Sequence, residues 1–252
     1  MPEYPNQRIN VLGVWIDSLG LAELLERVSA LARDGEQHTV MYANVHVLNT
    51  VVEDALLRRT LNNADLVYCD GDGVRLGARL LGQHLPQRMT GADWIYPACE
   101  HWQQEGLSVF FFGGAPGVAD RAVAKLKRQY PALRIAGTHA GFFTDSSAVV
   151  AAVNVARPDI LLAGMGTPIQ ERWVAEHATH LEVSVIWTVG AVMDFVSGEA
   201  PRAPRWMLGY GLEWLGRLLA EPRRLWRRYL IGNPLFLWRV LQQRLGLLRF
   251  ED

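Results

Sequence analysis

The stretch Leu66-Val67-Tyr68-Cys69-Asp70-Gly71-Asp72-Gly73 is a short apolar run followed at once by carboxylates and glycines. Similar apolar runs, rich in β-branched residues, recur at 11–16, 39–43, 109–112, 135–138, 160–163 and 185–189. Segments with helical periodicity lie between them, at 19–32, 47–61, 118–129, 148–156 and 169–180. Strands that alternate with helices in this way form parallel sheets, and continuously apolar strands are covered on both faces. The sequence therefore predicts an α/β fold in which a parallel sheet lies between helices.

The chain has 252 residues, of which 50% are hydrophobic and 20% charged, enough for one large domain with an appendage. The composition changes after Gly198, and Pro201 and Pro204 predict a stiff, non-helical joint. We therefore expect a core at residues 1–200 and an appendage at 201–252. Two cysteines fit a reducing compartment, the first residues lack a signal-peptide pattern, and no apolar run is long enough to span a membrane.

The predicted appendage is basic and rich in tryptophan. Residues 202–252 contain ten arginines and four carboxylates, a net charge of +6, whereas the whole chain carries −1. This asymmetry indicates an anionic partner, which the charge alone leaves open among phosphate, anionic lipid and nucleic acid. Asn233-Pro234 predicts the start of a last helix, whose apolar stripe and the tail tryptophans suit a membrane surface: Leu235, Trp238, Leu241, Leu245 and Leu248, with Trp206, Trp214 and Trp226. A packed helical extension or an oligomer contact is the alternative.

Small or polar residues follow five of the predicted strands. They are Asn44-Val45-His46, Asp70 to Gly73, Gly113-Gly114-Ala115-Pro116-Gly117, Gly164 to Glu171, and Gly190 to Asp194. Because ligands of open parallel sheets bind beyond the carboxyl ends of the strands, we expect one site there. The glycines of the third loop could admit a phosphate at a helix start, although turns also use them. A full dinucleotide fingerprint is missing, which counts against a nicotinamide enzyme.

Asp70 is the most informative carboxylate, because a strand end directs it into the predicted cleft. It suits a general base for a sugar hydroxyl, and a turn aspartate is the alternative. Asp70 and Asp72 also resemble a metal-binding pair, but such glycine-rich pairs are common in plain turns. Arg88 suits a diphosphate, and Thr90 or Asp93 could cap the next helix. His46 is a site candidate, whereas His177 and His180 fit an exposed helix face better than a metal site.

The order and spacing of several blocks resemble the WecG/TagA/CpsF family, glycosyltransferase family 26. The blocks are Asn44-Val-His46, Ala64-Asp-Leu66, Asp70 to Val74, Arg88 to Asp93, Phe112-Gly-Gly114, Gly164 to Trp173, Gly190 to Phe195 and, in the tail, Gly211 to Tyr229. The resemblance covers about residues 10–235 and implies a Rossmann-like core. It also implies an inverting transferase that needs no metal or other cofactor, with a UDP-sugar donor and a polyprenyl-diphosphate-linked acceptor, in bacterial exopolysaccharide or cell-surface polysaccharide synthesis.

Carried over by position, the resemblance makes Asp70 the catalytic base and Asn44, Arg88 and Gln170 substrate contacts. Arg217, Arg224 and Arg227 become tail arginines that close over the diphosphate. The remaining predicted substrate-site residues are His46, Thr90, Asp93, Gly113, Gly114, Gly164, Gly166, Glu171 and Asp194. Many relatives have threonine where this chain has Tyr42, so the donor sugar stays open among N-acetylmannosamine, glucose and uronic acid derivatives, with a hexose favoured over the N-acetylmannosamine type.

The resemblance implies a peripheral enzyme on the cytoplasmic side of the inner membrane, in contact with its anionic surface. A nucleic-acid partner is not expected, because the body of the chain is acidic. The sequence leaves a homo-oligomer open. Two rival hypotheses remain at this stage: a nucleotide-binding oxidoreductase or methyltransferase, and a non-catalytic module that binds anionic surfaces.

Overall fold

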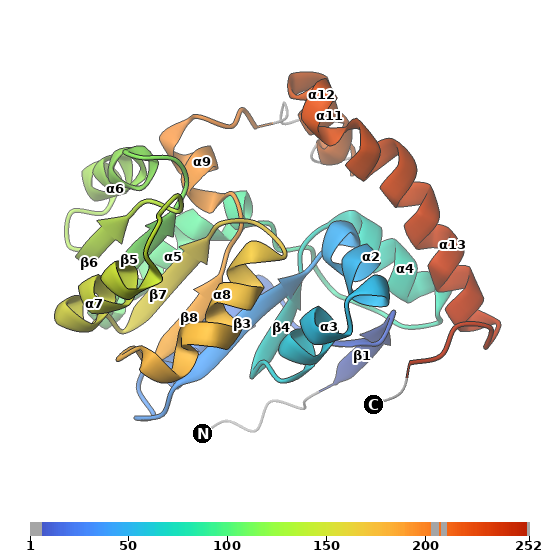
Figure 1. Cartoon of the computed structure of the whole chain (residues 1–252), viewed down its shortest axis with the longest axis horizontal. Helices are drawn as coiled ribbons and strands as arrows, with labels where there is room; N and C mark the ends of the chain where they lie inside the picture. The colour runs from blue at the N-terminus through green and yellow to red at the C-terminus, as the bar shows by residue number, and fades with distance from the viewer. Residues whose placement is uncertain (1–6, 203–206, 208–210, 251–252) are drawn as a thin grey trace.

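The computed structural model describes residues 7–202, 207 and 211–250, and its centre is a six-stranded parallel sheet (Figure 1). The strand order is β4-β3-β8-β7-β5-β6. The strands are β3 (His38–Ala43), β4 (Leu66–Cys69), β5 (Ser108–Gly113), β6 (Arg134–His139), β7 (Ile160–Gly164) and β8 (Val185–Thr188). Nearly every residue of β4, β5, β7 and β8 is buried, as expected for strands covered on both faces. The predicted fold class is confirmed.

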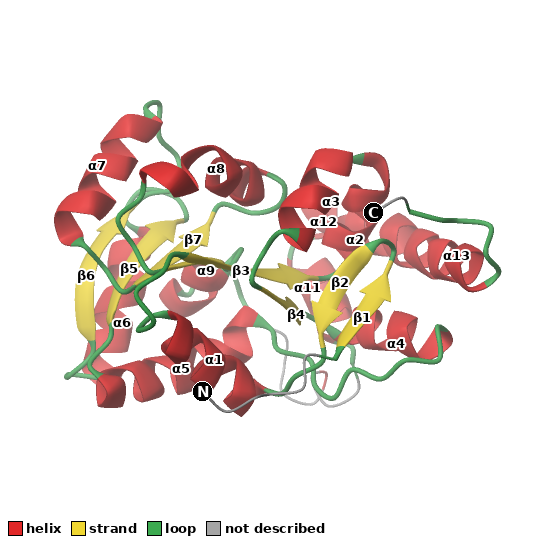
Figure 2. Ribbon diagram, turned by 90° about the horizontal axis from the view of Figure 1, so that it is seen from below, coloured by secondary structure: helices red, strands yellow, loops and turns green. Residues whose placement is uncertain are grey.

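Helices cover both faces of this sheet (Figures 1 and 2). On one face lie α2 (Val45–Glu53), α3 (Ala55–Asn62), α7 (Ser146–Ala156) and α8 (Ile169–His177), the last of which a 3₁₀ turn extends over Ala178–His180. On the other lie α1 (Leu21–Leu31), α5 (Gly91–Glu105), α6 (Val118–Gln129) and α9 (Val192–Ser197). All strands run parallel, so the loops that follow them meet at one edge of the sheet.

Two elements differ from the sequence-based prediction because of local turn chemistry. The single strand predicted at 11–16 is an antiparallel hairpin of β1 (Arg8–Val11) and β2 (Val14–Asp17), whose turn places Gly13 at φ 79°. The single helix predicted at 47–61 is divided into α2 and α3 at Asp54, whose carboxylate accepts a hydrogen bond from the Leu57 amide at 2.9 Å. Side-chain capping at Asp54 therefore starts a second helix where periodicity alone predicted one.

The C-terminal part forms α11 (Glu213–Ala220), α12 (Pro222–Trp226), the π-helical turn η2 (Arg227–Ile231) and α13 (Gly232–Arg244), while Pro204 and Trp206 lie outside the described residues. The predicted last helix is therefore longer, because α12 and η2 run directly into it. Pro234 offers no N–H to the carbonyl of Leu230 and its ring crowds that carbonyl, which accounts for the widened turn just before it. Among the described residues no helix is long and apolar enough to cross a bilayer.

The last helix runs along one side of the molecule (Figure 1) and shares its core. It packs against α2 and against α4 (Asp72–Leu80), and Phe236 and Val240 are buried within the main hydrophobic core. A Cβ atom at Gly77 would lie 2.6 Å from the Phe236 ring, so glycine allows this close approach. Leu218, Leu225 and Tyr229 form a separate small cluster in α11, α12 and η2.

Candidate active site

A cavity of about 1600 Å³ opens beyond the carboxyl ends of β3, β4, β7 and β8, and Asp70 lies in its wall. Asp70 follows β4 directly, and its backbone amide bonds to the Ala43 carbonyl at 2.9 Å, which continues the pairing of β3 with β4. Asn44 donates its side-chain N–H to the Asp70 carboxylate at 3.0 Å. The side-chain oxygen of Asn44 accepts a hydrogen bond from the Val47 amide at 3.0 Å and thereby caps α2. This cap fixes the amide that orients Asp70.

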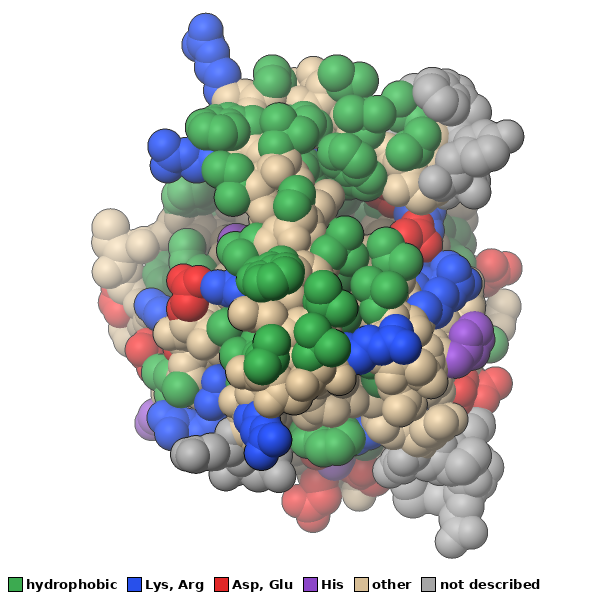
Figure 3. All heavy atoms as spheres, turned by 90° about the vertical axis from the view of Figure 1, so that its right-hand side faces the viewer, with side chains coloured by type: hydrophobic (Ala, Val, Ile, Leu, Met, Phe, Trp, Pro, Cys, Tyr) green, Lys and Arg blue, Asp and Glu red, His purple; other side chains and the backbone are tan. Residues whose placement is uncertain are grey.

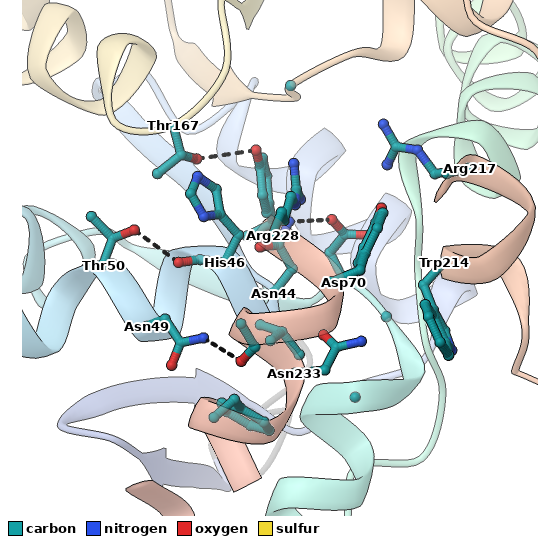
Figure 4. Close-up of a pocket in the computed structure, with 18 of the residues that line it drawn as sticks. Asn44, His46, Asn49, Thr50, Asp70, Thr167, Trp214, Arg217, Arg228 and Asn233 are labelled. Atoms are coloured by element: carbon teal, nitrogen blue, oxygen red, sulfur yellow. Dashed lines mark hydrogen bonds between the residues drawn. The ribbon is translucent and has the colours of Figure 1, made fainter. Parts of the chain in front are cut away.

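Two tail arginines, Arg217 and Arg228, line the same cavity as Asp70. Figure 4 shows Asn44, His46, Asp70 and Arg228 close together near the middle of the view, with Arg217 on the other side of Asp70. Burial raises the pKa of Asp70 above its ordinary value, while the Asn44 hydrogen bond and the charges of Arg217 and Arg228 act in the opposite direction. The arrangement places a proton acceptor beside two cations that can meet negative charge.

Arg88 lines the same cavity but is already paired with carboxylates. Its guanidinium lies 2.8 Å from Glu213 of α11, 3.4 Å from Asp72 and 3.7 Å from Asp93. Thr90, at the start of α5, donates its hydroxyl to Asp93 at 2.8 Å. Thr90 occupies the N-cap position of α5, but its side chain accepts no capping hydrogen bond, because the hydroxyl is turned to Asp93. Asp93 also lies beside Arg88.

Gln170 and Glu171 are buried beneath the cavity, where Gln170 joins the loops after β7 and β8 to strand β3. The side-chain oxygen Oε1 of Gln170 accepts hydrogen bonds from the backbone amides of Gly166 at 3.2 Å and Gly190 at 3.0 Å. Its side-chain N–H₂ donates to the Tyr42 hydroxyl at 3.2 Å and to Glu171 at 2.8 Å. Burial raises the pKa of Glu171 above its ordinary value. The structure thus places Gln170 among protein groups that shape the cavity floor, with Tyr42 above it in the wall.

The glycine loops pack backbone against backbone. A Cβ atom at Gly113 would lie 2.1 Å from the Gly164 carbonyl oxygen, and one at Gly164 would lie 2.4 Å from the Gly190 carbonyl oxygen. We call Gly113, Gly164 and Gly190 the glycine row. Of these three, Gly190 lines the cavity, as does Gly166. The predicted phosphate loop follows β5, one strand beyond the strands whose ends surround Asp70.

The cavity unites most of the predicted site. Its lining includes Asn44, His46, Asp70, Arg88, Thr90, Gly166, Arg217, Arg224 and Arg227. Among the described residues, its lining does not include Asp93, Gly113, Gly114, Gly164, Gln170, Glu171 and Asp194. Asp194 lies in α9, where burial raises the pKa of its carboxyl and the charge of Arg224 opposes that shift.

Arg228, Thr167 and Glu213 are among the lining residues that the predicted site did not include. The near-helical spacing of Arg228 with Arg217 and Arg224 was a usable signal for the first. Thr167 bonds through its hydroxyl to Tyr42 at 3.3 Å and to Glu171 at 2.9 Å. Glu213 reaches the site through a contact with Arg88 across 125 positions of sequence, which no local pattern announces.

The acidic groups at the cavity do not converge as metal ligands. Asp72, which the sequence paired with Asp70, lies 3.1 Å from Arg75 and 3.4 Å from Arg88. Within the described part of the chain, no group of three or more His, Cys, Asp or Glu side chains is placed to hold a metal ion. The described residues that line the cavity include nine arginines and five carboxylates, so the cleft is rich in cations.

Comparison with known families agrees with this geometry. The profile of the glycosyl transferase WecG/TagA/CpsF family matches residues 9–249, which is most of the chain. The chain belongs to this family. As a WecG/TagA/CpsF protein it is a glycosyltransferase, and the rival hypotheses of an oxidoreductase, a methyltransferase or a non-catalytic module give way to that assignment.

Curated relatives of this WecG/TagA/CpsF protein carry a specific enzyme name. A protein of Bacillus spizizenii named N-acetylglucosaminyldiphosphoundecaprenol N-acetyl-beta-D-mannosaminyltransferase is 29% identical over 203 residues, which cover 81% of this chain and 78% of the relative. A protein of Staphylococcus aureus with the same name is 24% identical over 239 residues, 94% of this chain and 93% of the relative. The similarity therefore includes the tail as well as the sheet.

Proposed function

We propose that this protein transfers a sugar, with inversion and without a metal, from a UDP-sugar to a saccharide linked to a polyprenyl diphosphate, in the synthesis of a bacterial exopolysaccharide or other cell-surface polysaccharide. The observation that carries the proposal is the position of Asp70. It is a carboxylate at a strand end, oriented by Asn44 at 3.0 Å, in the wall of a large cavity that tail arginines also line. The names of the relatives support an acceptor that carries a diphosphate on a polyprenyl chain.

In the proposed reaction an acceptor hydroxyl attacks the anomeric carbon of the donor. The new bond joins the acceptor oxygen to that carbon, the bond from the carbon to the UDP oxygen breaks, and the hydroxyl proton passes to the Asp70 carboxylate. UDP leaves with the bonding electron pair and additional negative charge. A single attack on the face opposite the leaving group inverts the anomeric configuration.

The departing diphosphate requires positive charge, which the tail can supply. Arg217, Arg224, Arg227 and Arg228 all line the cavity. Arg217 lies with its guanidinium 5.0 Å from the centre of the Phe195 ring, so α9 supports it from below. Fixed cations at the position where charge develops stabilise the transition state. Asp72 forms ion pairs with Arg75 and Arg88. This pairing supports a reaction in which arginines, rather than a metal ion held by Asp70 and Asp72, stabilise the diphosphate.

A contact with the membrane follows from the acceptor and from the outer face of the tail. Figure 3 looks onto α13 and shows apolar side chains gathered along it, with arginines beside them. The exposed members include Leu230, Ile231, Leu237, Trp238, Leu241, Leu245 and Leu247, and Trp226 is also exposed. Apolar burial together with arginines near anionic lipid gives reversible attachment. We place the protein peripherally on the cytoplasmic side of the inner membrane, with its cavity near that surface.

The donor sugar is the finer part of the proposal. The names of the relatives favour an N-acetylmannosamine donor. Tyr42 extends a buried aromatic side chain to the cavity wall, where its hydroxyl bonds to Thr167 and Gln170. A ring at this position reduces the room beside the anomeric centre, which keeps a plain hexose among the candidates.

A donor panel tests the function directly. Purified protein with a polyprenyl-diphosphate-linked N-acetylglucosamine in vesicles is supplied with UDP-N-acetylmannosamine, UDP-glucose or UDP-glucuronic acid, with and without a chelator. We expect transfer from one donor, unaffected by the chelator. NMR of the product should show an anomeric configuration opposite to that of the donor. Asp70→Asn should abolish transfer, and Asp145→Asn, an exposed helix cap where asparagine caps equally well, is the matched control. Full activity of Asp70→Asn would refute the assigned base.

A further inference from the structure

The tail segment that carries the site arginines has its own small hydrophobic cluster. Leu218, Leu225 and Tyr229 are buried together, with Trp214 and Leu215 packed against them. This cluster is separate from the main core, which α13 joins only through residues further along the chain. Specific contacts must therefore hold α11, α12 and η2 over the cavity.

The ion pair between Glu213 and Arg88 is such a contact. It joins the first turn of α11 to the segment before α5 at 2.8 Å, and the two side chains are only 12% and 16% exposed. Asp72 and Asp93, the other carboxylates near Arg88, each contact a further arginine, Arg75 and Arg202 respectively. Arg88 is the arginine that forms an ion pair with Glu213 in the structure. A mostly buried pair of this kind is costly to break from one side.

We propose that Glu213 is a positioning residue whose ion pair with Arg88 docks the arginine-bearing segment 213–231 against the strand edge that carries Asp70. Arg217 lies one helical turn after Glu213, so the pair sets where Arg217 enters the cavity. Arg88 then acts through Glu213, rather than as the diphosphate ligand that the sequence predicted. This inference rests on the proposed function for its effect on catalysis, but the docking can be measured without it.

The same geometry brings a second negative charge toward the base. The charge of Glu213 raises the pKa of Asp70, whereas Arg217 and Arg228 lower it. The titratable neighbours on the strands beneath are Tyr42 of β3 and Tyr68 and Cys69 of β4. Loss of the Glu213 charge lowers the pKa of Asp70, whereas release of Arg217 and Arg228 with the undocked segment raises it. A shift of the acid limb of the kcat/KM profile to lower pH in Glu213→Gln would therefore show that the arginines stay beside Asp70, and it would count against the docking role.

A double-mutant cycle with Glu213→Gln and Arg88→Met tests the pair. We expect each single variant to lose at least about tenfold in kcat/KM, because a mostly buried charge loses its partner. The double variant should lose about as much as one single variant, since the pair can be broken only once. Glu105→Gln, which removes a carboxylate from an exposed ion pair with Arg33, is the matched control and should match the wild type.

Amide hydrogen exchange of the full-length variants gives the readout that does not depend on activity. Both single variants should exchange faster than the wild type in residues 213–226, while α5 in the core stays unchanged. Additive losses in the cycle, with wild-type exchange in 213–226, would show that Arg88 acts directly on the substrate and overturn the proposal. A wild type without transferase activity would refute the proposed function, and the exchange data would still decide the docking.

Discussion

Asp70, the proposed general base, is partly buried in the wall of the cavity. Desolvation disfavours its charged form, and one amide hydrogen bond from Asn44 together with two arginines partly offsets that cost. The pKa therefore rises from the value of an exposed aspartate, which brings the carboxylate closer to the basicity that a general base needs near neutral pH. The site thus gives up stability to hold a base in place.

The first prediction concerns Asp70→Asn. Because folding raises the pKa of this group, its contribution to stability is present at low pH and is lost as the pH rises through the folded-state pKa. Asparagine does not ionise, so the variant does not lose this stability as the pH rises. Its melting temperature at pH 7 should therefore exceed that of the wild type, and the difference should shrink at acidic pH. Its kcat should fall by about 10²- to 10⁴-fold. Calorimetry over a pH series and a transfer assay measure the two effects, and a lower melting temperature at pH 7 would contradict the first.

The second prediction concerns His46. Burial and the charge of Arg228 lower the pKa of this histidine to about 4, so its ring stays neutral near pH 7. NMR spectra of ring-labelled protein should show no titration of His46 between about pH 5.5 and 8, where an exposed histidine titrates. Arg228→Met should raise the midpoint. A His46 midpoint near 6.5 in the wild type would show that the ring is solvated and distant from Arg228.

At the scale of single elements, α13 has two faces with different roles. Phe236 and Val240 are buried in the main core, whereas Trp238 and Leu241 are 56% and 43% exposed. The stripe that sequence periodicity identified through Trp238, Leu241 and Leu245 is therefore the exposed face. The buried face depends on two residues that a search for a continuous stripe passes over.

The third prediction compares these faces. Phe236→Ala should lower the free energy of unfolding by about 3–5 kcal/mol, because it leaves a cavity against Gly77 in α4. Trp238→Ala should change it by no more than about 0.5 kcal/mol. Urea titration of both variants is the measurement. Equal effects would show that the two faces are assigned wrongly.

Strands and helices with a clear hydrophobic periodicity could be predicted from the sequence. A helix whose pattern is interrupted by glycines that permit close packing could not. The run 66–69 coincides with β4, and 118–129 coincides with α6. No helix was predicted over α4, whose Gly73 and Gly77 weaken the helical signal. Tertiary contact explains both glycines, because a Cβ atom at Gly73 would lie 2.5 Å from Val45 and one at Gly77 would meet Phe236.

At the scale of the whole molecule, the site is shared between the sheet edge and a tail that also shapes the outer surface. The strand-end residues Asn44 and Asp70 could be predicted, because parallel strands bring their carboxyl ends together. The pairing of Glu213 with Arg88 could not, because it depends on how the tail folds back. For the same reason, deletion of the tail tests its role poorly, since Phe236 and Val240 would leave the core with it.

The fourth prediction therefore uses point substitutions on the outer surface. Trp238→Ala combined with Leu241→Ser should weaken binding to vesicles of anionic lipid at least about tenfold, while transfer to a water-soluble acceptor analogue stays unchanged. Binding of the wild type should fall with added salt, because arginines contribute beside the apolar face. Vesicle sedimentation measures both effects. Undiminished sedimentation of the variant would assign this face to another partner.

The glycine row has a consequence for attempts to retarget the enzyme. A methyl group at Gly113 or Gly164 would meet the carbonyl oxygen of the neighbouring segment, and one at Gly190 would meet the Tyr42 hydroxyl, so the row offers no position that can be varied. Selectivity among sugars must come from side chains that line the cavity, such as Tyr42 and His46. Libraries that randomise those two positions and preserve the row should yield variants with altered donor preference.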